Sequence, residues 1–278
     1  MTGLSLASSP FNLPLLREGL KPFRLHYFPR LRSTNDHAAV LRRRGDLYAP
    51  AVVLTGRQTA GRGRGSNTWF SAAGSLTVTF VLPVDETVPA HQLPLAAGVA
   101  ARNAAAELAQ NQNIQLKWPN DLVFQSAIGD PQSAMRKLAG LLCERLDNVD
   151  LIGIGMNVHP PKRALPKGLR DRVIHVAEIP PQSSVGGPAA ALDLNSVVIT
   201  LARHLHLTLI RHSETPFPML LREYDAHHAL VGRTVTIRGA AGEAPVTGRC
   251  QGLDDTGRLL VKNRTGVVRI LAGHVEVG

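Results

Sequence analysis

Glycine and arginine alternate in one short stretch of the sequence, at a spacing suited to binding an anion. The stretch reads Gly56-Arg57-Gln58-Thr59-Ala60-Gly61-Arg62-Gly63-Arg64-Gly65 and is followed by Trp69. Glycine lets backbone N–H groups turn toward a ligand, and arginine offers a planar, permanently charged fork that matches phosphate or carboxylate oxygens. Such a loop contributes little to a core, so it indicates that the chain binds a nucleotide or another phosphorylated ligand.

Three further polar segments can contribute to such a site. Ser33-Thr34-Asn35 begins a predicted helix, where its side chains and free backbone donors either bind a small polar group or simply cap the helix. Lys117-Trp118-Pro119-Asn120-Asp121 follows a short apolar run and also fits an ordinary turn. Arg136-Lys137-Leu138-Ala139-Gly140 begins an apolar strand, and its lysine either reaches into a cleft or remains solvated. Each segment taken alone leaves both interpretations open.

Length and composition indicate a globular protein with one large domain and one small domain. The chain has 278 residues, of which 44% are hydrophobic and 4% aromatic, so its core must be mainly aliphatic. No apolar run approaches the roughly 20 residues that span a bilayer, and the N-terminus lacks the ordered regions of a signal peptide. Cys143 and Cys250 are far apart and no CxxC motif occurs, which argues against a disulfide or metal scaffold. We therefore expect a cytoplasmic protein.

Positive charge exceeds negative charge along the chain. The sequence has 31 Lys and Arg residues against 21 Asp and Glu residues, a formal net charge of +10. The surplus is distributed from Arg42-Arg43-Arg44 to Arg269 and forms no basic tail. Such a charge favours association with acidic partners, whether a nucleotide, a nucleic acid or an acidic protein. A non-catalytic nucleic-acid-binding module is therefore one alternative that composition leaves open.

Hydrophobic patterning predicts an α+β fold with a mixed, largely antiparallel sheet and helices mostly on one of its faces. Ser33 and Gly45 are placed to begin and end a helix. The predicted helices cover residues 33–45, 91–110, 194–212 and 218–228, and the predicted strands cover residues 51–55, 75–82, 114–118, 138–146 and 149–158. Beyond residue 230 the pattern changes to four short strands, at 233–238, 247–253, 258–261 and 267–271, which predict a small antiparallel barrel.

Taken together, five segments resemble the catalytic module of biotin protein ligases and occur in the order typical of that family. They are Ser33-Thr34-Asn35, Gln58 to Trp69, Lys117-Trp118-Pro119-Asn120-Asp121, Lys137-Leu138-Ala139-Gly140 and Gly153-Ile154-Gly155-Met156-Asn157. The resemblance implies a class II synthetase-like catalytic domain over residues 25–229 and an SH3-like C-terminal β-barrel over residues 230–278. Residues 1–24 lack periodicity, and we expect them to form a loosely attached N-terminal arm.

The resemblance implies that ATP activates biotin to biotinyl-5′-AMP and that biotin is then transferred to a lysine of a carrier protein. Arg64, Lys137 and Asp121 are the implied catalytic residues, with Mg²⁺ as cofactor and Asp121 as its ligand. The implied binding residues for biotin and ATP are Ser33, Thr34, Asn35, Gln58, Arg62, Gly63, Arg64, Trp69, Lys117, Trp118, Asn120, Lys137, Gly140 and Asn157. The loop departs from many relatives at Gly65-Ser66-Asn67-Thr68, where one further cation is replaced.

The implied partner is the biotin carboxyl carrier protein of acetyl-CoA carboxylase or of a related biotin-dependent carboxylase. Only 32 residues precede Ser33, too few for a helix-turn-helix domain with its linker, so we expect a form without the N-terminal DNA-binding domain and no repression of transcription. The sequence leaves monomer and homodimer equally open. A lipoate–protein ligase is the enzymatic alternative, although those enzymes usually lack both the Gly-Arg-Gly-Arg loop and the Lys-Trp-Pro-Asn-Asp run.

Overall fold

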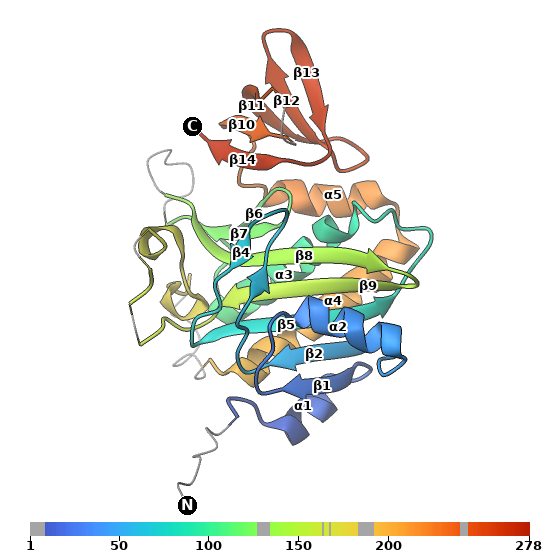
Figure 1. The fold of residues 1–278 in the computed structure, drawn as a ribbon. Helices are drawn as coiled ribbons and strands as arrows, with labels where there is room; N and C mark the ends of the chain where they lie inside the picture. Colours follow the sequence, from blue (N-terminus) through green and yellow to red (C-terminus); the bar gives the residue numbers. More distant parts are fainter. Residues whose placement is uncertain (1–8, 127–133, 163, 167, 183–191, 240–243) are drawn as a thin grey trace, which may run out of the picture.

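A seven-stranded mixed sheet forms the centre of the molecule, in a computed structural model that describes residues 9–126, 134–162, 164–166, 168–182, 192–239 and 244–278 (Figure 1). Only the outermost pair, β1 and β2, is parallel, and the other neighbouring strands are antiparallel. The predicted mixed, mainly antiparallel sheet is thus confirmed. In sheet order the strands are β1 (Arg24–Phe28), β2 (Ala51–Thr55), β5 (Ser75–Pro83), β9 (Val149–Asn157), β8 (Arg136–Leu146), β7 (Asp121–Phe124) and β6 (Ile114–Lys117).

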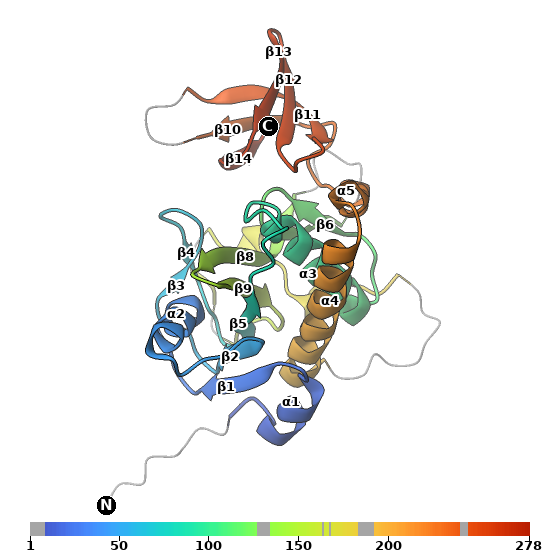
Figure 2. The ribbon, with the colours of Figure 1, turned by 90° about the vertical axis from the view of Figure 1, so that its right-hand side faces the viewer.

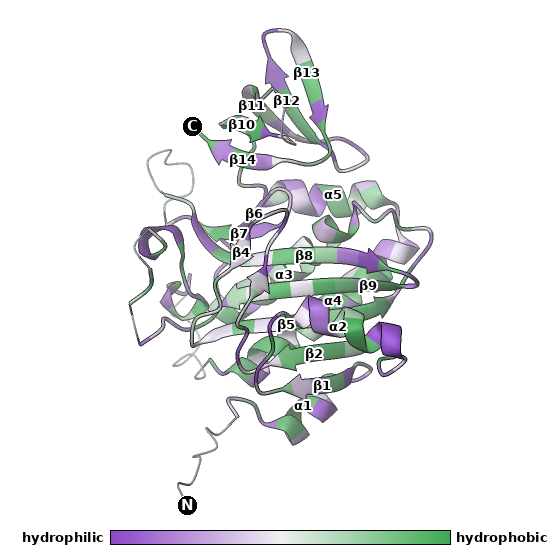
Figure 3. Ribbon diagram, in the orientation of Figure 1, coloured by the Kyte–Doolittle hydropathy of each residue, from purple (hydrophilic) through white to green (hydrophobic). Residues whose placement is uncertain are grey.

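Helices cover the two faces of this sheet unequally (Figures 1 and 2). The long helices α3 (Leu93–Ala109) and α4 (Leu194–Glu214) pack on one face, where the many alanines of α3 are buried. On the other face lies α2 (Thr34–Arg44), which forms the crossover between the parallel strands β1 and β2. The central strands carry mainly apolar residues (Figure 3), and all nine residues of β9 are buried. Helices therefore cover the α3–α4 face more fully than the α2 face, in agreement with the prediction.

Local capping explains where α2 begins and ends. The Ser33 hydroxyl accepts a hydrogen bond from the Asp36 backbone N–H at 3.3 Å, which satisfies one of the free donors at the helix start. Gly45 follows the last turn with φ of +78°, a left-handed conformation that glycine adopts without steric cost. Both predicted boundaries are confirmed, and Ser33 has the structural role that the sequence left as an alternative.

The expectation of a loose N-terminal arm is wrong for residues 9–24, while residues 1–8 lie outside the described part of the chain. A short helix, α1 (Leu13–Gly19), packs near α4 and leads directly into β1. Its few apolar side chains are enough to join it to the core, although they are too few to produce a clear periodicity. The buried residues of this segment are Phe11, Leu16, Leu20 and Phe23.

The C-terminal part forms a second sheet of five antiparallel strands rather than the four predicted. The extra strand is the last one, which has only four residues. Helix α5 (Phe217–Ala226) lies between the two sheets, and the C-terminal core is continuous with the main core. The strands, in sheet order, are β13 (Gly266–Ile270), β12 (Leu259–Asn263), β11 (Val246–Leu253), β10 (Thr234–Arg238) and β14 (His274–Val277).

Three small elements complete the described part of the fold. A two-stranded hairpin, β3 (Gly61–Arg62) with β4 (Thr68–Trp69), contains the second half of the glycine–arginine stretch, from Gly61 to Gly65. Two 3₁₀ helices, η1 (Arg170–Arg172) and η2 (Val176–Glu178), follow β9. Among the described residues, none of the helices has the length and apolar character needed to cross a membrane.

Candidate active site

Every residue predicted for the site lines a single cleft of about 880 Å³. The cleft runs over the same face of the main sheet as α2, from the start of that helix to the edge of the C-terminal sheet. The β3–β4 hairpin covers it from one side, and the turn between β6 and β7 borders it from another. Segments more than 100 residues apart in the sequence therefore meet in one place.

Two glycines of β9 make the floor of the cleft flat. Gly153 and Gly155 are two residues apart, so both face the same side of the strand. A Cβ at Gly153 would clash with the Asn35 amide, and a Cβ at Gly155 would clash with the Trp69 indole. The Gly-Ile-Gly sequence thus lets one polar and one aromatic side chain lie directly against the sheet backbone.

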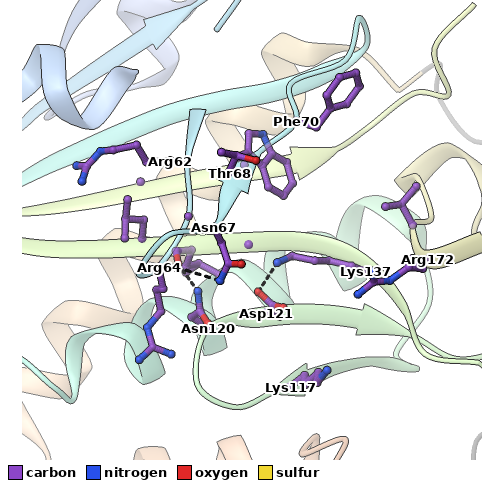
Figure 4. Close-up of a pocket in the computed structure, with 18 of the residues that line it drawn as sticks. Arg62, Arg64, Asn67, Thr68, Phe70, Lys117, Asn120, Asp121, Lys137 and Arg172 are labelled. Carbon is purple, nitrogen blue, oxygen red and sulfur yellow. Dashed lines mark hydrogen bonds and ion pairs between the residues drawn. The ribbon is translucent and has the colours of Figure 1, made fainter. Parts of the chain in front are cut away.

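Lys137 and Asp121 form an ion pair in the cleft (Figure 4). The Lys137 Nζ atom lies 2.6 Å from Asp121 Oδ1 and 5.9 Å from the centre of the Trp69 ring, within range of a cation–π contact. Gly140 is the register partner of Asp121, and a Cβ there would lie 3.1 Å from Lys137 Nζ. The glycine therefore leaves the space in which the ammonium and carboxylate groups meet.

Two asparagines predicted to lie near a nucleotide hold the backbone around this ion pair. Asn157 donates its amide hydrogen bond to the Lys137 carbonyl at 3.2 Å. Asn120 donates to the Leu141 carbonyl at 2.6 Å, and the Leu141 N–H donates back to the Asn120 carbonyl at 2.9 Å. Both side chains line the cleft, so they fix its walls and also face its interior.

The polar end of the cleft is built around the first turn of α2. Gln58 accepts hydrogen bonds from the Thr34 N–H at 2.9 Å and from the Thr34 hydroxyl at 3.4 Å. Asn35 donates to the Leu142 carbonyl at 3.1 Å and accepts from the Thr79 hydroxyl at 2.6 Å. Buried polar groups held in this way present donors and acceptors in fixed directions, which suits recognition of a small polar molecule.

The two arginines of the hairpin have different surroundings. Arg62 Nε lies 2.8 Å from Asp36 Oδ1, and Arg62 Nη2 lies 2.7 Å from Glu144 Oε2. The hydrogen bonds to Glu144 raise the pKa of Arg62. Burial lowers the pKa of Arg64, and the charge of Asp121 opposes that shift. Arg64 has no ion pair in the described part of the chain, so its guanidinium remains available in the cleft.

Positive charge dominates the lining of the cleft. Among the described residues, the lining contains two carboxylates, Asp121 and Asp171, against six lysine and arginine side chains. Burial lowers the pKa of Lys117, Asp121 raises it, and neighbouring cations lower it further. An anion bound here would relieve this repulsion, which favours a polyanionic ligand. The basic residues are Arg62, Arg64, Lys117, Lys137, Arg172 and Arg238.

Comparison with known proteins identifies the family. Residues 27–160 match the biotin/lipoate A/B protein ligase family, and residues 230–278 match the biotin protein ligase C terminal domain. A Mycobacterium tuberculosis protein named biotin–[acetyl-CoA-carboxylase] ligase is 30% identical over 230 residues, which cover 81% of this chain and 77% of that protein. The chain belongs to the biotin protein ligase family.

Other relatives agree with this membership. A Bacillus subtilis protein named bifunctional ligase/repressor BirA is 27% identical over 237 residues, and the chain spans 66% of that protein's length. The solved structure of a biotin protein ligase from Aquifex aeolicus, in complex with biotin and ATP, has a TM-score of 0.75 at 26% identity. That match covers 92% of this chain and 98% of the Aquifex protein.

Several residues of the biotin protein ligase cleft were not predicted from the sequence. Arg172 and His175 come from the segment after β9, and Arg238 and His274 come from the edge of the C-terminal sheet. The segment after β9 has no hydrophobic period, and strand edges have no distinctive residue pattern, so no signal in the sequence marks these residues. Glu144 was likewise missed as the partner of Arg62.

Proposed function

We propose that this chain activates biotin with ATP to form biotinyl-5′-AMP and transfers the biotin to a lysine of a carrier protein. The observation that carries the proposal is the shared cleft, in which a polar pocket at α2 opens toward Arg64 and the Lys137–Asp121 ion pair. The Aquifex relative in complex with biotin and ATP supports both substrates. The following steps assign roles to the residues of this chain.

In the first step, an oxygen of the biotin carboxylate attacks the α-phosphorus of ATP and the bond to pyrophosphate breaks. Both reactants are anions, so their approach requires positive charge close to the reacting atoms. Arg64 and Lys137 are proposed to supply this charge, since both face the cleft. Asp121 would hold the Lys137 ammonium in place until the phosphate arrives.

Biotin is proposed to lie between the start of α2 and Trp69. The polar contacts for its ring and carboxylate ends come from Ser33, Thr34, Asn35 and Gln58. Trp69 forms an apolar wall beside them. Trp118 also lines the cleft, is 2% exposed and donates to the Gly257 carbonyl at 3.4 Å, so we propose it as a second, fixed part of the wall around biotin and the adenylate. ATP would occupy the basic end of the cleft.

In the second step, the carrier lysine attacks the carbonyl carbon of the adenylate and AMP leaves. The amine must first lose a proton, because an ammonium group has no lone pair for attack. We assign this role to Asp121, which lines the cleft as a carboxylate and is already engaged with an ammonium group.

The residues of the cleft are compatible with Mg²⁺. The described residues contain no cluster of three or more His, Cys, Asp or Glu side chains that could hold a metal alone. Mg²⁺ typically binds through one or two carboxylates together with substrate phosphates and water, and Asp121 meets that requirement. When bound, the ion would reduce the negative charge on the phosphates of ATP.

The proposed partner is the biotin carboxyl carrier protein of acetyl-CoA carboxylase or of a related carboxylase. The name of the Mycobacterium tuberculosis relative supports this choice. The cytoplasmic location and the absence of DNA repression remain predictions. Monomer and homodimer both remain open.

Incubation with ATP, Mg²⁺, biotin and a carrier domain, followed by an avidin blot, tests the proposal. We expect signal that depends on ATP and on the carrier lysine. Lipoylation in place of biotinylation would favour a lipoate ligase. Salt-sensitive retention on DNA without any blot signal would instead favour a nucleic-acid-binding module.

A further inference from the structure

Glu144, on β8, joins the hairpin to the polar end of the cleft although it does not line the cleft itself. Its Oε1 and Oε2 atoms accept hydrogen bonds from Arg62 Nη2 at 2.8 and 2.7 Å. Its Oε2 atom also accepts a hydrogen bond from Asn35 Nδ2 at 2.8 Å. One carboxylate thus contacts both a hairpin residue and a residue of the proposed biotin pocket.

Each partner of Glu144 is held by a second contact from another element. Arg62 Nε pairs with Asp36 of α2. The side-chain oxygen of Asn35, Oδ1, accepts a hydrogen bond from the Thr79 hydroxyl of β5, and its side-chain nitrogen, Nδ2, also donates to the Leu142 backbone carbonyl. The two donors are therefore fixed in orientation, and Glu144 is the group that they share.

This arrangement contributes little to stability. The side chains of Arg62, Asp36 and Glu144 are 43%, 50% and 34% exposed, and ion pairs this accessible to solvent typically add little to the free energy of unfolding. The geometry of these contacts, however, restricts the orientation of the Glu144 side chain and its partners, because a carboxylate that accepts several charged or amide hydrogen bonds tolerates few alternative positions. A positioning role therefore accounts for the cluster better than a stabilising role.

We propose that Glu144 is a positioning residue that couples the β3–β4 hairpin to Asn35 in the biotin pocket. This inference rests on the proposed function. The two arginines then have different roles. Arg62 anchors the base of the hairpin through Glu144 and Asp36, and Arg64 at the tip of the hairpin acts on the substrate. Without Glu144, Arg62 keeps only its pair with Asp36, and the Asn35 side chain keeps only its bonds to Thr79 and Leu142. The hairpin and the biotin pocket therefore lose one shared constraint together.

Two substitutions of Glu144 test the inference. Glu144→Leu removes every acceptor. Glu144→Gln keeps the shape but turns one acceptor into a donor, which then faces Arg62 or Asn35, both of which are donors. The matched control is Glu107→Gln with Glu107→Leu. Glu107 is also shared between an arginine and a second donor, at 2.6 to 2.8 Å, but on the helical face of the sheet.

The first readout needs no substrate. Trypsin cleavage after Arg62 and Arg64, followed by mass spectrometry, reports how firmly the hairpin is held. We expect cleavage several-fold faster in the Glu144 variants than in wild type or the Glu107 variants. Adding Arg62→Ala to Glu144→Leu should accelerate cleavage after Arg64 by less than Arg62→Ala does in the wild-type background, because the Arg62–Glu144 contact is already lost and only the Asp36 pair remains to be removed.

The second readout is the KM for biotin in the ligase assay. We expect Glu144→Leu to raise it about tenfold, the size of one hydrogen bond to a charged group. We also expect a lower kcat, because the loosened hairpin carries Arg64. An unchanged biotin KM in both Glu144 variants overturns the coupling, even if cleavage accelerates. If the wild-type protein does not use biotin at all, the proposed function fails, whereas the cleavage comparison still decides whether Glu144 anchors the hairpin.

Discussion

Replacing Lys137 with alanine should reduce adenylate formation far more than it reduces stability. Removal of one cation that stabilises a transition state typically lowers the rate by about 10²–10³-fold, or roughly 3–4 kcal/mol. The ion pair with Asp121 is short at 2.6 Å, but the two side chains are 37% and 23% exposed. A pair this accessible contributes only about 0–1 kcal/mol to folding. The two effects therefore differ enough to be separated by experiment.

Pyrophosphate release measures the first step in Lys137→Ala, and denaturant unfolding measures the free energy of unfolding. Lys21→Ala is the matched control, because Lys21 Nζ lies 2.7 Å from Glu18 Oε2 in an exposed pair outside the cleft. We expect the control to have wild-type kinetics. Lys137→Ala with wild-type pyrophosphate release, or with activity lost only in proportion to unfolding, would refute the role assigned to Lys137.

Three further substitutions test other parts of the molecule. In Gly155→Ala the new methyl group would overlap the Trp69 indole. We expect either a loss of about 1–3 kcal/mol in the free energy of unfolding or a displaced indole with a higher KM for biotin. If denaturant unfolding and the biotin KM are both unchanged, the packing described is wrong. Arg64→Gly should slow adenylate formation by about 10²-fold and release more adenylate into solution. Chromatography measures the released adenylate. If the variant retains the adenylate as the wild type does, Arg64 has no role in holding it. His212→Phe should reduce acid sensitivity: burial lowers the pKa of His212 below its usual 6.5, so the unfolded chain binds the proton more readily and stability falls as the pH drops below about 6.5. Denaturant unfolding at neutral and mildly acidic pH measures this, and an equal decline in both proteins counts against it.

Local signals in the sequence predicted much of the main sheet and most of the helices. The ends of α2 were predicted because Ser33 and Gly45 act on neighbouring backbone atoms, whatever the rest of the fold does. Strand β7 was missed because Pro119-Asn120-Asp121 fits a turn, and the strand starts at Asp121 itself. The N-terminal helix and the last strand were missed because seven and four residues are too short to show a period.

The residue types in the cleft were also predictable, but their partners were not. The glycine–arginine stretch indicates an anion-binding site on its own, whereas the lysine and aspartate segments indicate one only through the family resemblance. The sequence does not show that Arg62 binds Glu144, because 82 residues separate them. It also does not show that the edge of the C-terminal sheet borders the cleft.

The order of the motifs and the chemistry of their side chains were therefore determined by the sequence alone, since both are properties of individual residues and their neighbours. Tertiary structure decided which arginine is anchored and which is available, and how Trp69 and Asn35 fit against the glycines of β9. The physical reason is the short range of the contacts that form the cleft. Hydrogen bonds and ion pairs act over about 3 Å, and only the strand order and register of the folded sheet bring distant residues that close together.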